Sequence, residues 1–207
     1  MSTIAIPNSI LPRTGIAVFD FDDTLIAGDS LPRFLDEVAG VARTRLAMVG
    51  AVAGALAGHA VRRPVGVDFP GSVKALLLRA TLKGIAKTAA LEAAFRLKGR
   101  LRWLAPQLEA LHRHAAAGHR IVVASGALDI YLPILLDGLP VHDILATDME
   151  ILDNRLTGRL ASGNCVRAHK AERVRPLLAA VNGPSWGYGN RPSDLPMLAL
   201  VDHPTLV

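Results

Sequence analysis

The sequence predicts an α/β protein: a three-layer sandwich with a mostly parallel sheet, interrupted by an inserted all-α domain. Short apolar runs at residues 17–19, 120–124, 142–147 and 185–189 have the length and composition of buried parallel strands. Helical segments separate these runs, and such alternation is typical of a parallel sheet covered on both faces. Between the first two runs, residues 31–117 show apolar side chains at three- and four-residue spacing, which indicates the helical insertion.

The first apolar run, residues 17–19, leads directly into a group of carboxylates. Asp20, Asp22 and Asp23 fall within four positions and are followed by Thr24. Open α/β sheets bind ligands just beyond the carboxyl ends of their strands, so these side chains lie where a site is expected. Like charges this close together are costly unless a cation or a proton relieves them. An acidic turn after the strand is the alternative interpretation.

The insertion begins with a turn into a helix, where Asp29 or Ser30 can cap the first turn. Residues 46–61 form the longest run without a charged side chain, but it is short for a membrane span and is interrupted by glycines. We therefore expect a buried helix there and no transmembrane segment. The helical pattern breaks at residues 63–71, and Pro106 opens a further helix.

The second strand, residues 120–124, ends in Ser125 and Gly126. A hydroxyl donor followed by a residue without a side chain lets a phosphate approach the backbone closely, so this pair fits a phosphate site. An ordinary turn is the alternative, because Ser-Gly pairs are common in turns. We expect a helix to follow over residues 127–136.

Three further features follow along the chain. Residues 150–160 have the pattern of a β-hairpin around an Asp-Asn turn. Lys170 lies near the start of a helix, where a lone lysine is most often a solvated surface residue. The strand at 185–189 leads directly into Asn190, and Asp194 follows four residues later.

Length and composition limit the classes of protein to which this chain can belong. Its 207 residues fit one substantial domain or one domain with an insertion. Cys165 is the only cysteine, which excludes an internal disulfide framework and suits a reducing compartment. Residues 1–14 lack the basic region and apolar run of a secretory signal, so we expect a cytoplasmic protein.

The positive charge of the chain is concentrated in the insertion. The net charge is +5, and residues 29–100 hold 12 Lys and Arg against 5 Asp and Glu. Such an excess could attract an anionic substrate, a membrane surface or a nucleic acid, or it could belong to solvated helix faces. The sequence contains no nucleic-acid-binding motif, so we expect no nucleic-acid partner.

Residues 20–24, Asp-Phe-Asp-Asp-Thr, resemble the first motif, D-x-D-x-T, of the haloacid dehalogenase-like (HAD) phosphohydrolases. Ser125 and Lys170 follow in the order of the second and third motifs of that family. The stretch from Asn190 to Asp194 matches the fourth motif in spacing, although its first residue differs.

The passage from residue 156 to residue 170 also resembles the phosphoserine-phosphatase-like branch of the superfamily, and the overall resemblance spans residues 16–207. It implies a Rossmann-like sheet with a helical cap inserted after the first motif. On that basis we expect residues 1–28 and 102–207 to form the core domain and residues 29–101 to form the cap. The sequence makes no prediction about the oligomeric state.

The resemblance also implies roles for the motif residues. Asp20 would be the nucleophile that accepts the phosphoryl group, and Asp22 the general acid and base. A magnesium ion would bridge the nucleophile and the substrate phosphate, while Ser125 and Lys170 would offset the charge of the transferring oxygens. The expected magnesium ligands are Asp20, Asp22, Asn190 and Asp194, and the expected phosphate or substrate contacts are Asp23, Asp29, Ser125, Gly126 and Lys170.

Two positions leave alternatives open. Asp29 falls near the place of a substrate-contacting Glu in the phosphoserine phosphatases, but a helix cap is an equally good interpretation. Asn190 stands where the relatives commonly carry a metal-binding aspartate, and an amide oxygen can coordinate magnesium but brings no negative charge. The expected activity is magnesium-dependent hydrolysis of a small phosphorylated metabolite. The alternative is a weakened or inactive homologue that binds a phosphorylated ligand or partner.

Overall fold

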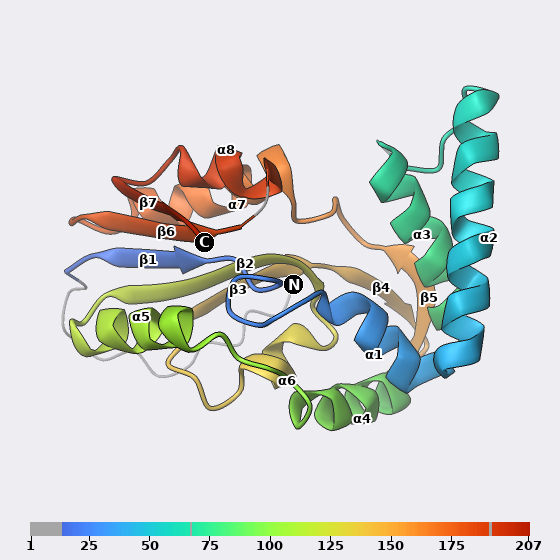
Figure 1. The fold of residues 1–207 in the computed structure, drawn as a ribbon, viewed down its shortest axis with the longest axis horizontal. Coiled ribbons are helices and arrows are strands. Elements are labelled where there is room, and N and C mark those ends of the chain that lie inside the picture. Colours follow the sequence, from blue (N-terminus) through green and yellow to red (C-terminus); the bar gives the residue numbers. More distant parts are fainter. Residues whose placement is uncertain (1–13, 67, 191) are drawn as a thin grey trace.

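The computed structural model describes residues 14–66, 68–190 and 192–207 (Figure 1). Within these residues the main sheet has five strands in the order β3-β2-β1-β6-β7, and every neighbouring pair is parallel. The strands are β1 (Ile16–Phe19), β2 (Arg120–Leu128), β3 (Asp143–Thr147), β6 (Ser185–Gly189) and β7 (His203–Leu206). The predicted α/β fold with a parallel sheet is confirmed. The prediction about a secretory signal falls almost wholly outside the described residues.

Different helices cover the two faces of the sheet, because successive strand residues point to opposite sides. Phe19 belongs to the core cluster shared with α5 (Ala105–Ala116), whereas Val18 belongs to the cluster shared with α7 (Arg167–Ala179) and α8 (Leu195–Leu198). Figure 1 shows α5 on one side of the sheet and α7 and α8 on the other. The strands are therefore apolar on both faces, which explains their continuous apolar runs.

Five helices lie between β1 and β2 in the described chain, and four of them precede α5. These four are α1 (Ser30–Ala39), α2 (Val41–Ala60), α3 (Phe69–Leu82) and α4 (Lys87–Lys98). Asp29 caps α1, since its side chain accepts a hydrogen bond from the Leu31 amide at 3.0 Å. The chain leaves and re-enters the sheet region side by side, because the Ala27 amide donates to the Arg102 carbonyl at 2.8 Å. We propose a cap at residues 29–101, which these adjacent connections support.

Helix α2 is not the buried helix that the sequence predicts. Thr44, Ala51 and Ala55 are its buried residues, while Leu46 is 75% exposed and Val49 is 68% exposed. Among the described residues, α2 is the one helix that is long and apolar enough to cross a membrane, judged by length and composition alone. It lies at the edge of the molecule and packs on α1 and α3 (Figure 1). The prediction is wrong because composition does not show on how many sides a helix has neighbours.

Strand β2 is longer than predicted. It continues past Gly126 to Leu128, which pairs with Thr147 of β3 after an irregularity in the register. The helix predicted over residues 127–136 is reduced to α6 (Leu132–Leu136). Backbone pairing with β3 thus takes the residues that local preference assigned to the helix.

The predicted hairpin is present as β4 (Met149–Leu152) and β5 (Arg155–Leu160), joined by an Asp-Asn turn whose two residues have positive φ. It packs against the helical insertion, where β5 contacts α3. The Gly84 amide after α3 donates to the Leu156 carbonyl at 2.8 Å. The hairpin therefore stabilises the position of α3 over the sheet.

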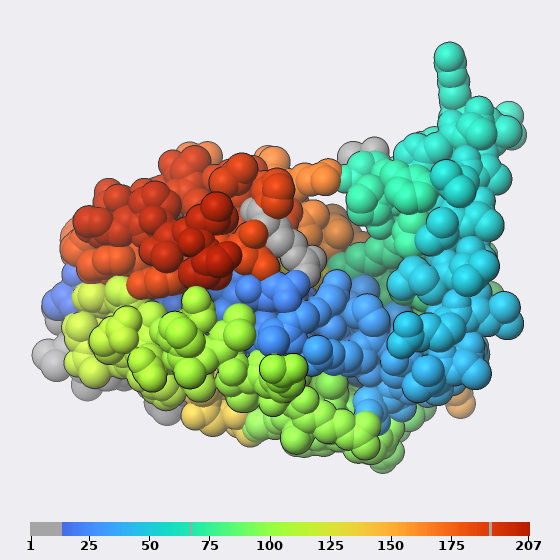
Figure 2. Space-filling view, in the orientation of Figure 1, coloured from blue at the N-terminus to red at the C-terminus, as the bar shows by residue number. Residues whose placement is uncertain are grey.

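The carboxyl end of the sheet faces the helical insertion. Figure 1 shows the arrow of β1 pointing toward the side on which α1, α2 and α3 lie. Figure 2 shows a hollow there, between α2 and α3 and the orange and red C-terminal elements. A cavity of about 570 Å³ lies on this side and is lined from both the sheet edge and the insertion. This is the place where open α/β sheets bind ligands.

Candidate active site

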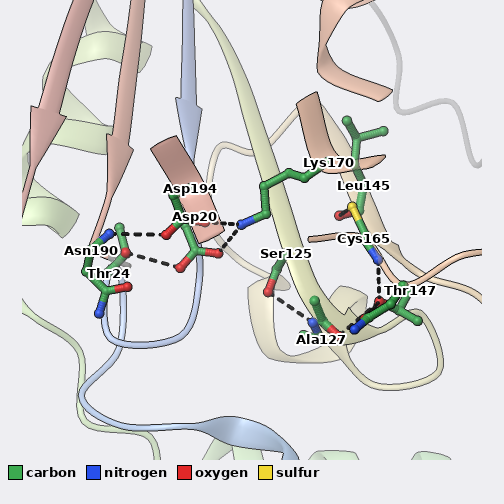
Figure 3. Close-up of polar contacts among 12 residues, drawn as sticks. Asp20, Thr24, Ser125, Ala127, Leu145, Thr147, Cys165, Lys170, Asn190 and Asp194 are labelled. Carbon is green, nitrogen blue, oxygen red and sulfur yellow. Dashed lines mark hydrogen bonds and ion pairs between the residues drawn. The ribbon is translucent and has the colours of Figure 1, made fainter. Parts of the chain in front are cut away.

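Asp20 directly follows β1 at the carboxyl edge of the sheet (Figure 3). Its amide donates to the Tyr188 carbonyl of β6 at 2.9 Å, which fixes the backbone. One carboxylate oxygen accepts a hydrogen bond from Lys170 Nζ at 2.7 Å and the other from the Thr24 hydroxyl at 3.2 Å. Burial raises the pKa of Asp20, and the adjacent Lys170 opposes that rise. The two partners hold the carboxylate in one orientation, as a nucleophile requires.

Lys170 lies in the first turns of α7 and joins two carboxylates. Its Nζ donates to Asp20 Oδ1 at 2.7 Å and to Asp194 Oδ1 at 2.6 Å, and its side chain is 2% exposed. Burial alone would lower the pKa of Lys170, but the two carboxylates outweigh burial and raise it. One cation between two ionised carboxylates leaves a net negative charge, which a bound cation would offset.

Asp22 is held by the start of α1. Its Oδ1 accepts a hydrogen bond from the Ser30 amide at 2.7 Å. Burial and the nearby Asp29 and Asp20 raise the pKa of Asp22 to about 7, against the lowering effect of the Ser30 hydrogen bond. A carboxyl group with a pKa near neutrality can both give and take a proton, which suits a general acid and base.

The residues at the middle of β2 form a tight corner of the cavity. Ser125 is fully buried, and its Oγ accepts a hydrogen bond from the Ala127 amide at 3.1 Å. Its own hydroxyl proton can then be donated to a ligand oxygen. A Cβ on Gly126 would lie 2.9 Å from Val166 Cγ1, so a side chain there would force a shift. Glycine is needed at this position for space.

Lys74 of α3 is a residue of this site that sequence interpretation missed. Its Nζ donates to the Gly126 carbonyl at 2.6 Å and to Asn164 Oδ1 at 2.7 Å, and it lines the cavity. Burial lowers the pKa of Lys74 to about 8, against the attraction of nearby carboxylates. This side chain links the helical insertion to the corner of the cavity that contains Ser125 and Gly126. In the sequence it is one basic residue of a basic segment, so no pattern singled it out.

Asn190 follows β6, and its backbone amide donates to Asp194 Oδ2 at 3.2 Å. Its side-chain oxygen is buried and has no hydrogen-bond partner among the described residues. A buried acceptor without a donor is costly, and a cation would satisfy it. No three Asp, Glu, His or Cys side chains of the described residues are grouped so that they could hold a metal ion. Asn190 is not among the described residues that line the cavity, although its backbone is bonded to Asp194. Its amide oxygen and the carboxylates of Asp20, Asp22 and Asp194 are oxygen donors of the kind that magnesium takes, so the residue types present fit this ion.

The cavity brings together most of the predicted site residues. They are Asp20, Asp22, Asp29, Ser125, Gly126, Lys170 and Asp194. Asp29 both caps α1 and lines the cavity, so the two interpretations of this residue are compatible. Asp23 is not among the described residues that line it, and its Oδ1 accepts a hydrogen bond from the Gly28 amide at 2.5 Å. A direct phosphate contact of Asp23 stays a prediction.

The fold and the site together define a class of protein: an α/β protein with a buried aspartate and a ligand cavity at the carboxyl end of a parallel sheet. The family model of the haloacid dehalogenase-like hydrolases matches residues 17–199. The chain therefore belongs to the haloacid dehalogenase-like hydrolase family, and the membership predicted from the motifs is confirmed.

Solved structures share this fold. A HAD family hydrolase from Salmonella enterica subsp. enterica serovar Typhi is 26% identical, with a TM-score of 0.65 over 92% of this chain and 61% of that one. A probable phosphoserine phosphatase from Vibrio cholerae is 20% identical, with a TM-score of 0.66 over 93% of this chain and 55% of that one. A protein of unknown function from Bordetella pertussis Tohama I is 21% identical, with a TM-score of 0.68 over 94% and 90%. The chain thus spans 61% and 55% of the first two proteins.

Proposed function

We propose that the chain is a magnesium-dependent phosphatase that hydrolyses a small phosphomonoester through an aspartyl-phosphate on Asp20. One observation carries the proposal: Lys170 holds Asp20 and Asp194 at 2.7 and 2.6 Å in a cavity that also contains Asp22, whose pKa is about 7. This set provides a nucleophile, a cation for the charge of the phosphate, and a proton donor and acceptor.

The reaction takes two steps. In the first, a carboxylate oxygen of Asp20 forms a bond to phosphorus, the bond from phosphorus to the alcohol oxygen breaks, and Asp22 gives the alcohol its proton. In the second, water gives a proton to Asp22 and attacks phosphorus, and the bond from phosphorus to Asp20 breaks. Phosphate is released, and both aspartates return to their starting states.

The surrounding residues stabilise charge during both steps. Ser125 and Lys170 donate hydrogen bonds to the phosphoryl oxygens, where negative charge is concentrated. Asp20, Asp22, Asn190 and Asp194 would hold the magnesium ion, whose positive charge would further offset the charge of the phosphoryl group. Lys74 links the insertion to the backbone of Gly126, which holds the insertion beside Ser125.

The test is Asp20→Asn, assayed for phosphate release from para-nitrophenyl phosphate with and without magnesium. The variant is expected to fold and to keep less than a few per cent of the activity, because a neutral amide is a poor nucleophile. The matched control is Asp137→Asn, since Asp137 pairs with Lys98 on the surface and its side chain is 74% exposed. The control variant is expected to keep full activity.

Beryllium fluoride provides a second readout, because it mimics a phosphoryl group on aspartate. It is expected to inhibit the wild-type chain only when magnesium is present. Substantial activity in Asp20→Asn would contradict the mechanism. Binding of phosphate without any turnover by the wild-type chain would support the alternative, an inactive homologue that binds phosphorylated ligands. The absence of a negative charge at Asn190 would then help to explain the loss of activity.

A further inference from the structure

The cavity has two chemically different halves. The half at the sheet edge is polar and contains Asp20, Ser125 and Lys170. The facing wall comes from α1, α2 and α3 and is largely apolar. Its apolar residues are Leu31, Met48, Val52, Phe69, Val73 and Leu77. A ligand that fills the cavity therefore meets a phosphate site at one end and hydrocarbon at the other.

The charged side chains on the insertion side of the cavity already have partners. Lys74 donates to Gly126 and Asn164, as described above. Asp68 accepts a hydrogen bond from the Gly71 amide at 2.8 Å and forms an ion pair with Arg167. A zwitterionic substrate body would have to compete with these contacts, whereas an apolar body would not.

We propose that the substrate is an amphiphilic phosphomonoester, whose phosphate is esterified to an alcohol that carries an apolar chain. This inference rests on the proposed phosphatase function and specifies its substrate class. The phosphate occupies the polar half beside Asp20 and Lys170, and the chain lies along the wall that contains Met48 and Val73. Burial of the chain against this wall provides the binding free energy that distinguishes it from polar phosphometabolites.

The test is a series of alkyl phosphates, from methyl to octyl, assayed below the concentrations at which they form micelles. The value of kcat/KM is expected to rise with chain length, by roughly two- to fourfold per methylene until the wall is covered. Phosphoserine is expected to be hydrolysed no better than methyl phosphate.

The variants Met48→Gln and Val73→Thr keep the size of two wall residues and add polarity. They are expected to flatten the dependence of kcat/KM on chain length, because each added methylene then gains less from contact with the wall. The matched control is Val49→Thr, because Val49 neighbours Met48 on α2 but is 68% exposed and does not line the cavity. A flat series, or a preference for phosphoserine, would overturn the inference while leaving a working phosphatase. Failure to hydrolyse any phosphate would instead contradict the proposed function itself.

A second observation concerns the outer face of α2. Leu46, Val49 and Leu56 lie on one side of the helix and are 75%, 68% and 58% exposed. The opposite side packs on α3, where Gly54 lies close to Leu76. A helix that is apolar on all sides is normally covered on all sides, either by protein or by a membrane. In Figure 1 none of the other helices and strands of the described residues is packed against the outer side of α2.

The charges around α2 indicate what covers it. Arg45 near its start and Arg62 and Arg63 after its end are exposed, and residues 41–63 contain no acidic side chain. A second copy of this helix would bring arginines against arginines in either direction, which is unfavourable. We propose that the outer face of α2 docks on the surface of an anionic bilayer, with its apolar side chains in the interface and its arginines on lipid phosphates.

Sedimentation with vesicles tests this docking. The chain is expected to bind vesicles that contain about a third phosphatidylglycerol and to bind pure phosphatidylcholine vesicles at least tenfold more weakly, as expected when several basic residues contact anionic lipid. Leu46→Gln with Leu56→Gln is expected to reduce binding at least tenfold. Phe95→Ser is the control, because Phe95 is 62% exposed on α4, away from α2. Absence of vesicle binding, or a dimer in sedimentation velocity that the α2 variant disrupts, would overturn the proposal.

Discussion

The side-chain oxygen of Asn190 is buried without a hydrogen-bond partner in the described part of the chain, while its backbone amide donates to Asp194. Magnesium dehydrates reluctantly and is held mainly by charge, so an amide in place of a carboxylate weakens its binding. We expect Asn190→Asp to lower the magnesium concentration that gives half-maximal activity by roughly ten- to a hundred-fold, the equivalent of about 1–3 kcal/mol. A magnesium titration of phosphate release, run on both forms, measures this shift.

Asn154→Asp is the matched control, because Asn154 lies in the exposed turn of the β4–β5 hairpin and the change adds the same charge. It is expected to leave the titration unchanged. An unaltered or higher half-saturating concentration in Asn190→Asp would mean that Asn190 is not a metal ligand. Its amide would then serve to fix the loop that carries Asp194, through the bond to Asp194 Oδ2.

The surroundings of His114 predict that the stability of the chain depends on pH. Its Nδ1 lies 2.8 Å from His119 Nδ1, and its Nε2 lies 2.9 Å from the Tyr188 hydroxyl. Burial, His119 and a nearby arginine lower the pKa of His114 to about 4, below its usual 6.5. The unfolded chain therefore takes up a proton more readily, so stability is full above pH 6.5 and falls as the pH drops toward 4.

Thermal melts between pH 7.5 and pH 5 measure this dependence. We expect about 1 kcal/mol of stability to be lost over this range, after allowance for solvent screening, or roughly 2–4 °C in melting temperature. His114→Gln is expected to make the dependence shallower. His112→Gln is the control, since His112 is exposed on the same helix. Equal slopes for wild type and His114→Gln would show that other groups cause the pH dependence.

Sequence patterns identified the site residues that lie at the carboxyl ends of predicted strands. Asp20 follows a buried strand, and Ser125 lies on the next one, so their meeting at the sheet edge follows from the parallel topology. Lys74 could not be identified in this way. Its contact with Gly126 depends on how α3 lies over the sheet, and that placement is set by tertiary packing rather than by any pattern around residue 74.

At the scale of the elements, Gly158 of β5 shows how closely the hairpin lies against the insertion. Its φ is +77°, and a Cβ there would lie 2.8 Å from Arg79 Cα and 3.0 Å from the Leu78 carbonyl oxygen of α3. We expect Gly158→Ala to lower the free energy of unfolding by about 1–3 kcal/mol, because it adds both backbone strain and a clash with helix backbone. Urea denaturation measures the change.

Gly50→Ala is expected to change the free energy of unfolding in the opposite direction, and it serves as the control for Gly158→Ala. Gly50 lies within α2 and a Cβ there would meet nothing within 4 Å. Alanine is expected to raise the free energy of unfolding by about 0.5–1 kcal/mol, because it reduces the entropy lost on folding. If Gly158→Ala proved as stable as the wild type, the hairpin would not be packed against α3 as the structure shows.

The elements that sequence analysis predicted correctly are those with strong local signals. The strands β1 and β6 are short apolar runs, and the hairpin has its Asp-Asn turn. Two predictions failed for non-local reasons. The carboxyl end of β2 continues because β3 pairs with it, and α2 is exposed because α1 and α3 cover only one of its sides. Neither the pairing of β2 with β3 nor the number of helices that pack on α2 can be inferred from residues close in sequence.

At the scale of the whole molecule, the basic insertion and the acidic strand tips lie on opposite sides of one cavity. Residues 29–100 carry 12 Lys and Arg against 5 Asp and Glu, while the rest of the chain is slightly acidic. A positive field around the mouth of the cavity would draw in an anionic substrate before any contact is made. Solvated helix faces are the alternative, and salt dependence separates the two.

We expect kcat/KM for a soluble phosphomonoester to fall severalfold between about 50 and 500 mM salt, while kcat changes by less than about twofold. Screening shortens the distance over which charges act from about 10 Å at 0.1 M to about 3 Å at 1 M, so it weakens the attraction of the approaching substrate but not the interactions at the buried site.

Arg167→Gln and Lys98→Gln test whether the position of the charge matters. Arg167 lines the cavity, whereas Lys98 pairs with Asp137 on α4, and each change removes one positive charge. Only Arg167→Gln is expected to lower kcat/KM at low salt and to reduce the salt dependence. If the two variants behaved alike, net charge rather than a field at the cavity would be responsible, and a kcat/KM independent of salt would leave the basic residues as solvated helix faces.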